Sequence, residues 1–240
     1  PLMLKFCLKD NKLSLEDLDY IAINSDPKAQ LFKKLKYTIR HRPEPKFLLD
    51  RLRNKKNRMS IETELRNIFP DNNFSGKIQY IEHHLCHLAS SYLVSPFNSS
   101  VAISVDGFGD FASSAWGIGE GNEITVKNRV YFPHSLGIFY QSMTQWLGFP
   151  NYGDEYKVMG LAPYGEPKFA QTILDNLIDL KDDGSFRLDQ SYFDYCTGLR
   201  MTNAKFDKLF GGPPRAEGEL LTQRHMNLAA SIQAVTEEVL

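Results

Sequence analysis

The sequence predicts an α/β fold with a mixed sheet, on three observations. Short apolar runs that favour strands alternate with stretches that repeat apolar residues at helical spacing. Two further strand-like runs flank the turn at residues 120–122, which indicates antiparallel pairing beside the parallel pairing of alternating units. The 240 residues, 42% of them hydrophobic, suffice for a core without disulfides. Three scattered cysteines form no disulfide framework, so we expect a reducing, cytoplasmic compartment.

The individual elements follow from spacing, caps and breakers along the chain. Ser14, followed by acidic residues, and Ser135 are placed to cap helix starts. The expected helices cover residues 2–9, 31–39, 61–68, 85–94, 137–147, 157–161, 168–180 and 226–240. The expected strands cover residues 20–23, 78–81, 101–105, 112–119, 124–131 and 186–188.

The net charge of −1 conceals an asymmetry between the two ends of the chain. Residues 1–80 hold 17 Lys and Arg against 10 Asp and Glu, whereas residues 81–240 hold 11 against 19. A basic surface can bind nucleic acid. The basic stretch between Lys28 and Arg58 lacks interleaved aromatic residues for base stacking, so solvated helix faces are the preferred interpretation and nucleic acid is not the expected partner. No segment has the pattern of a signal peptide or a membrane span.

Three of the six histidines lie in the segment EHHLCH (82–87). On a helix, His83 and His87 share one face about one turn apart, which is the spacing at which two neutral imidazoles bind one divalent metal. A zinc-protease motif would need a glutamate directly after the first histidine, where this chain has His84. The sequence therefore predicts a metal site that is not a protease site; the alternative is a helix start with incidental histidines.

An Asp-Gly-rich segment, SVDGFGD (104–110), follows a strongly β-prone run. The strand would end by presenting Asp106, and Gly107 and Gly109 would let backbone amides approach an anion. Asp106 could hold a metal that bridges to phosphate oxygens, and Asp110 could do the same or bind a ribose or substrate hydroxyl. The alternative is an ordinary turn, because Asp and Gly are common in turns.

The third candidate segment is YGDEYKVMGLAPYG (152–165), in which charges, glycines and a proline crowd together. Lys157 could contact a phosphate, while Glu155 could bind a nucleotide ribose or orient Lys157. The alternative is a surface turn with an ion pair between these two residues.

Together and in this order, these motifs resemble the O-carbamoyltransferase family of nodulation-factor and antibiotic biosynthesis. The matching stretches are residues 7–20, EHHLCHLASSY (82–92), SVDGFGD (104–110), HSLGIFYQSMTQWLGF (134–149) and GDEYKVMGLAPYG (153–165). The resemblance implies an actin-like, ribonuclease-H-like ATPase fold related to the tRNA threonylcarbamoyl-transfer enzymes. It also implies that ATP and carbamoyl phosphate give carbamoyl adenylate in a covalently linked C-terminal domain. The N-terminal domain then transfers the carbamoyl group to a small-molecule or sugar hydroxyl beside a bound metal, with Fe(II) favoured.

The resemblance assigns roles residue by residue. The metal ligands would be His83, His87 and Asp106. The nucleotide or carbamoyl-adenylate segment would comprise Asp106, Gly107, Phe108, Gly109, Asp110, Glu155, Lys157 and Gly160. Two imidazoles and one carboxylate also suit Zn, Mn or Ni, so the residues alone leave the metal open.

Two features of the family pattern are missing from the chain. The family begins with a His-Asp-Ala-Ser-type motif, whose histidine is the expected catalytic group, and it supplies a further metal aspartate from a later strand. We therefore expect residues 1–240 to be a partial N-terminal domain, incomplete at both ends, with a helical basic insert at about 26–70 and no adenylate-forming domain. This fragment alone would be inactive. A tRNA threonylcarbamoyladenosine-type transferase and a folded binding module without activity are the alternatives; the acceptor and the oligomeric state stay open.

Overall fold

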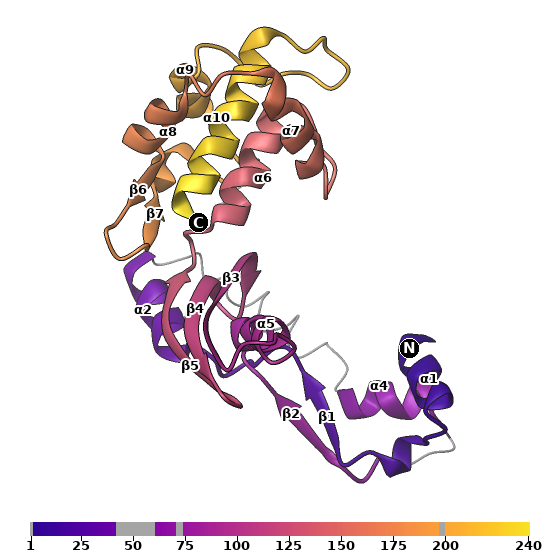
Figure 1. Ribbon diagram of the computed structural model, residues 1–240. Coiled ribbons are helices and arrows are strands. Elements are labelled where there is room, and N and C mark those ends of the chain that lie inside the picture. Colours follow the sequence, from indigo (N-terminus) through magenta and orange to yellow (C-terminus); the bar gives the residue numbers. More distant parts are fainter. Residues whose placement is uncertain (1, 42–60, 71–73, 197–199) are drawn as a thin grey trace. The chain divides into compact units, whose positions relative to one another are not determined.

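The computed structural model describes residues 2–41, 61–70, 74–196 and 200–240 (Figure 1). The chain divides into two compact units, one ending at Cys86 and the other running from His87 to Leu240. This division is finer than the one partial domain that the sequence predicts. The middle of the expected basic insert, residues 42–60, lies outside the described residues.

The first unit holds a short parallel sheet and small helices. Its strands pair in register from Tyr20 opposite Lys77 to Ile23 opposite Tyr80. Its elements are α1 (Leu2–Asp10), the 3-10 helix η1 (Leu15–Asp17), β1 (Tyr20–Ile23), α2 (Leu31–His41), α4 (Ile61–Ile68) and β2 (Lys77–Tyr80). The buried residues Leu8, Leu15 and Leu65 form its small core.

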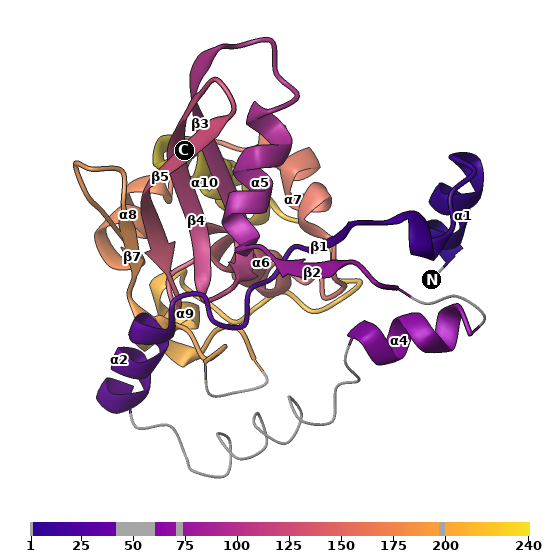
Figure 2. The ribbon, with the colours of Figure 1, turned by 90° about the horizontal axis from the view of Figure 1, so that it is seen from below.

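The second unit contains an antiparallel sheet with strand order β3-β4-β5. The strands are β3 (Ser99–Gly109), β4 (Ala112–Glu120) and β5 (Glu123–Tyr131). The second hairpin turns at residues 121–122, within the turn at 120–122 that the sequence predicts, with Gly121 at a φ of +58°. In Figure 2, helix α5 (His83–Tyr92) runs beside this sheet.

The side chains of α5 explain how close this helix lies to the sheet. Leu88 and Tyr92 pack against Ala102 and Ala115, whose small side chains leave room for the helix. A Cβ at Gly119 would lie 2.5 Å from Cδ1 of the Tyr92 ring, so a larger residue at this position of β4 would have to displace the ring. The Tyr92 hydroxyl lies 2.9 Å from the carbonyl oxygen of residue 98 and 3.1 Å from that of residue 121, within donating distance of both.

A mainly helical layer follows the sheet and contains the largest core. Its elements are α6 (Leu136–Trp146), α7 (Glu155–Leu161), η2 (Ala162–Tyr164), α8 (Ala170–Asn176), β6 (Ile178–Leu180), β7 (Phe186–Leu188), η3 (Gln190–Tyr192), α9 (Ala204–Leu209) and α10 (Gln223–Val239). Phe139, Met143 and Trp146 of α6 are buried here together with Leu228 and Ile232 of α10. The two helices lie side by side in Figure 1.

Most expected elements are confirmed to within a few residues, with three corrections. Among the described strands, parallel and antiparallel pairing both occur, but in separate sheets rather than in one mixed sheet. The helix expected over 168–180 ends at Asn176, because Ile178 and Leu180 alternate with an exposed aspartate and pair with β7. Strand β3 continues through Gly109 instead of ending before Asp106. Among the described helices, none combines the length and the hydropathy that crossing a bilayer requires.

Candidate metal centre

Helix α5 begins at His83 because Glu82 caps it. The Leu85 amide donates to Oε2 of Glu82 at 2.9 Å, which satisfies one of the amide groups left open at a helix start. Glu82 is thereby engaged in capping the helix. His84 is fully buried, with its ring edge-on to that of His83 at 5.4 Å between centroids. The cluster therefore contains one buried ring, that of His84, and two rings, those of His83 and His87, that share the other helix face.

His83 is oriented by the residue that follows strand β1. Its Nδ1 lies 3.2 Å from the carbonyl oxygen of Asn24. Because a carbonyl can only accept, this hydrogen bond requires the proton on Nδ1 and leaves the lone pair on Nε2. A ligand histidine is commonly held by a hydrogen bond of this kind from its other ring nitrogen. The contact thus makes Nε2 the ring nitrogen of His83 that could bind a metal.

His87 and Asp106 face each other across 3.4 Å between Nε2 and Oδ2. Their side chains are 47% and 40% exposed, so solvent and ions reach both. The other carboxylate oxygen of Asp106, Oδ1, accepts a hydrogen bond from the Gly107 amide at 2.6 Å. This bond directs Oδ2 towards His87.

Ligand atoms of His83, His87 and Asp106 all lie within 4.8 Å of one another. The boundary between the two compact units falls inside α5, and the continuous helix places His83 one turn before His87. Two ligands about 2.1 Å from one ion at a tetrahedral angle are about 3.4 Å apart, which matches the distance from His87 to Asp106. The donor set of two imidazoles and a carboxylate therefore fits a divalent transition metal.

The remainder of the Asp-Gly segment forms the end of β3 and a two-residue turn. Asp110 and Phe111 have positive φ values of +48° and +72°, and Gly109 pairs with Ala112 across the turn. The strain of a positive φ at Phe111 is offset by ring contacts, since Phe132 lies 5.3 Å from it between centroids. Phe132 also contacts Phe108, at 5.0 Å. Of the predicted nucleotide residues here, Asp106 alone belongs to the metal-ligand group.

In the segment 152–165, Lys157 forms an ion pair, but not the pair with Glu155 that the alternative interpretation of the sequence contains. Its Nζ lies 2.8 Å from Oδ1 of Asp154, rather than pairing with Glu155. The hydrogen bond that the Lys157 ammonium donates to Asp154 lowers the pKa of the Asp154 carboxyl and raises the pKa of Lys157. Burial, and secondarily Glu155, raises the pKa of Tyr140 to about 12. A Cβ at Gly160 would meet nothing within 4 Å, so no close packing requires this glycine.

Two other histidines have structural roles. Nδ1 of His134 accepts from the Leu188 amide at 3.1 Å, which joins the segment before α6 to β7. His225 caps α10, where its Nδ1 accepts from the Thr222 amide at 3.1 Å. Burial above all lowers the pKa of His225; the positive charges of Arg224 and Arg215 lower it further, while the charge of Glu219 opposes them.

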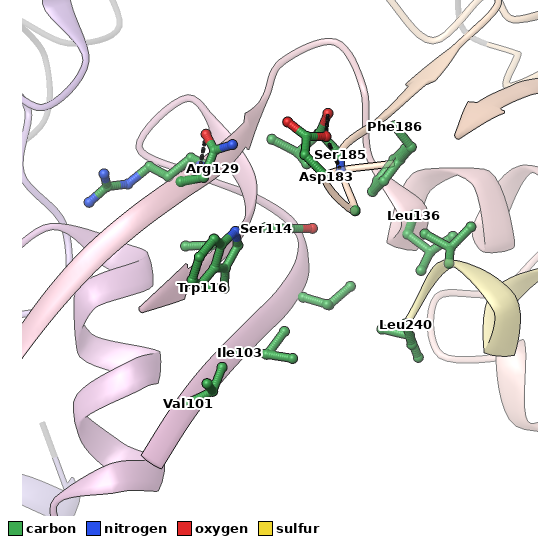
Figure 3. Close-up of a pocket in the computed structure, with 16 residues that line it drawn as sticks. Val101, Ile103, Ser114, Trp116, Arg129, Leu136, Asp183, Ser185, Phe186 and Leu240 are labelled. Carbon is green, nitrogen blue, oxygen red and sulfur yellow. Dashed lines mark hydrogen bonds between the residues drawn. The ribbon is translucent and has the colours of Figure 1, made fainter. Parts of the chain in front are cut away.

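The described part of the chain also has an apolar cavity of about 200 Å³ on the sheet face opposite α5. Figure 3 shows Ile103 and Trp116 of the sheet on one side, and Leu136, Phe186 and Leu240 on the other. None of the three candidate metal ligands lines this cavity.

Comparison with known proteins gives one family match and several relatives. Residues 3–240 match the family model described as carbamoyltransferase N-terminus. An uncharacterised protein of Synechocystis is 40% identical over 98% of this chain and 40% of its own length. Nodulation protein NolNO of Sinorhizobium fredii is 35% identical over 68% of the chain and 22% of its own length. Nodulation protein NolO of Bradyrhizobium diazoefficiens is 33% identical over 66% of the chain and 27% of its own length. The chain thus spans less than half the length of these relatives.

Proposed function

Because the chain belongs to the carbamoyltransferase N-terminus family, we propose that it carries the transfer site of an O-carbamoyltransferase. The donor would be carbamoyl adenylate, made from ATP and carbamoyl phosphate, and the acceptor a hydroxyl of a small molecule or sugar. The chain matches only a minority of the length of its relatives, so we place adenylate formation in a further domain of the full-length protein.

The observation that carries this proposal is the convergence of His83, His87 and Asp106. A divalent metal bound there, with Fe(II) as the favoured ion, would neutralise phosphate charge and polarise a carbonyl. In the chain itself, the Asn24 carbonyl holds His83 in the tautomer that leaves Nε2 for binding. The Gly107 amide holds Oδ1 of Asp106 and leaves Oδ2 facing His87.

The remaining assigned residues would bind the adenylate. Residues 107–110 directly follow the metal-ligand carboxylate, which supports a place for them beside the adenylate phosphate. We assign Glu155 and Gly160 to the nucleotide side as well. Lys157 could contact a phosphate only by exchanging its ion pair with Asp154, because that pair engages its ammonium group at 2.8 Å. The support for this second segment is accordingly weaker.

Metal binding by purified protein tests the proposal. Equilibrium dialysis against Fe(II) under argon, followed by elemental analysis, should give one ion per chain for the unmutated protein. His83→Ala and His87→Ala should each lose at least about tenfold in affinity, because two ligands then remain. Asp182→Asn, which removes an exposed carboxylate elsewhere, is the matched control and should bind as the unmutated protein does. Undiminished metal in both histidine variants would overturn the proposal.

The basic excess of residues 1–80 favours a second candidate, a tRNA threonylcarbamoyladenosine-type transferase. Its signature would be tRNA binding that weakens steeply with salt, as phosphate contacts require. A third candidate is a folded binding module. Incubation of the 240-residue chain with ATP, carbamoyl phosphate and Fe(II) should release neither AMP nor pyrophosphate; turnover would show that the chain needs no further domain.

A further inference from the structure

The start of helix α6 is built against the backbone of Asp106. The Ser135 hydroxyl, which is fully buried, donates to the Asp106 carbonyl oxygen at 3.0 Å and accepts from the Ile138 amide at 3.1 Å. One hydroxyl therefore caps α6 and anchors β3 at the same time. Ser113 donates to the His134 carbonyl at 2.6 Å, which fixes the residue before this cap.

Gly137, in the first turn of α6, makes this approach possible. A Cβ at this position would lie 2.9 Å from the Asp106 carbonyl oxygen and 3.1 Å from the Gly107 nitrogen. Both neighbours are backbone atoms, which cannot turn aside as a flexible side chain can. Any residue larger than glycine would therefore push the Asp106 segment away from α6.

Asp106 lies where the register between β3 and β4 changes. The pairing between β3 and β4 is regular up to Val105 opposite Ser114 and resumes only at Gly109 opposite Ala112. Residues 106–108 lie in the irregular stretch between, where a strand bends and its ladder is locally disrupted. The hydrogen bond from Ser135 attaches this irregular stretch to α6, at the residue whose side chain faces His87.

We propose that Ser135 and Gly137 are positioning residues, which set the place of the Asp106 carboxylate relative to His87. This inference rests on the proposed metal site and deepens it. With the Asp106 backbone held by α6 and Oδ1 held by Gly107, Oδ2 stays within reach of the metal position. Loss of the Ser135 hydroxyl releases the backbone while all three ligand side chains remain.

The test compares two buried serines of the same helix. Ser142 is fully buried, like Ser135, and its hydroxyl donates to the Ile138 carbonyl at 2.7 Å, away from Asp106. Ser135→Ala and Ser142→Ala therefore each remove one buried hydroxyl, but only the first touches the Asp106 segment. Metal affinity is measured by titration with Co(II), whose visible absorption reports ligand geometry, and with Fe(II) under argon.

We expect Ser135→Ala to weaken binding about 10- to 100-fold, the usual effect of losing a group that orients a ligand, and to change the Co(II) spectrum. Ser135→Thr, which keeps the hydroxyl, should recover most of the affinity, and Ser142→Ala should match the unmutated protein. Gly137→Ala should weaken binding by displacing the same segment; this variant decides the matter if Ser135→Ala does not fold by circular dichroism.

Two results would overturn the inference. One is Ser135→Ala or Gly137→Ala binding as tightly as the unmutated chain; the other is Ser142→Ala losing as much affinity as Ser135→Ala. If the unmutated chain binds and His87→Ala does not, such results refute the positioning role and leave the metal site standing. If the unmutated chain itself binds no metal, the proposed function and this inference fail together.

Discussion

Replacement of Arg215 by alanine should unfold the far end of the helix that supports Asp106. Arg215 is 8% exposed, and its guanidinium group closes the C-terminal end of α6. Nε donates to the Leu147 carbonyl at 2.6 Å, Nη2 donates to the Gly148 carbonyl at 3.2 Å, and Nη1 donates to the carbonyl of residue 219. The last carbonyls of a helix have no partner within the helix, and a positive charge there also opposes the negative end of its dipole.

The loss can be estimated from these three bonds. A hydrogen bond from a charged donor contributes about 1.5–3 kcal/mol, which gives an upper limit of roughly 9 kcal/mol for three. Alanine recovers the cost of burying the guanidinium and leaves space that water can enter, so we expect a net loss of about 3 kcal/mol. For a chain of this size that corresponds to a fall in Tm of roughly 6–12 °C.

Urea unfolding followed by tryptophan fluorescence measures this loss, because Trp146 lies in α6 and Trp116 in the neighbouring sheet. Arg187→Ala removes an exposed arginine of β7 and should change the free energy of unfolding by less than about 0.5 kcal/mol. Arg215→Lys keeps the charge but not the forked donors, so it should retain less than half of the stabilisation. The reasoning is refuted if the free energy of unfolding of Arg215→Ala lies within about 1 kcal/mol of that of the unmutated chain.

Two further predictions concern the cap of α10 and the packing of α5. Because the pKa of His225 is lowered from 6.5, its contribution to folding should be complete above pH 6.5 and decline as the pH falls below that value. His225→Gln, which can still accept from the Thr222 amide, should remove that part of the pH dependence of unfolding; an unchanged profile would contradict the assignment. Gly119→Ala should destabilise by about 1–3 kcal/mol, because its methyl group would overlap the Tyr92 ring. Gly160→Ala, with open space around the position, should be neutral or stabilise by up to about 1 kcal/mol in thermal unfolding, and equal losses in the two variants would refute the packing argument.

The sequence could predict those features of the site that depend on local periodicity. Helical spacing places His83 and His87 on one face whatever surrounds them, and a β-prone run places Asp106 near a strand end. The helix that carries His83 and His87, the strand that leads to Asp106 and the cap at Ser135 follow from such local signals, and the structure contains all three. By contrast, the extension of β3 beyond Asp106 depends on its pairing with β4, which lies outside the range of local propensity.

The contacts that prepare the site are long-range, and sequence spacing could not reveal them. Asn24 and His83 are 59 residues apart, and Asp106 and Ser135 are 29 apart. The sequence marked Ser135 as a helix cap, which is correct, but gave no sign that the same hydroxyl also holds Asp106. The glycine at position 137 was the available signal, because a glycine in the first turn of a helix is costly unless a neighbour must approach closely.

The distance from His87 to Asp106 therefore depends on two separate attachments to one sheet. Leu88 and Tyr92 fix helix α5 by packing on the sheet face. The Tyr92 ring occupies the space that Gly119 leaves. Asp106 is itself part of β3, and Ser135 holds it from the side of α6. Since these attachments share no side chain, a variant at Gly119 and a variant at Ser135 should weaken metal binding additively in free energy. A double variant no weaker than the worse single one would instead mean that α5 and α6 move together.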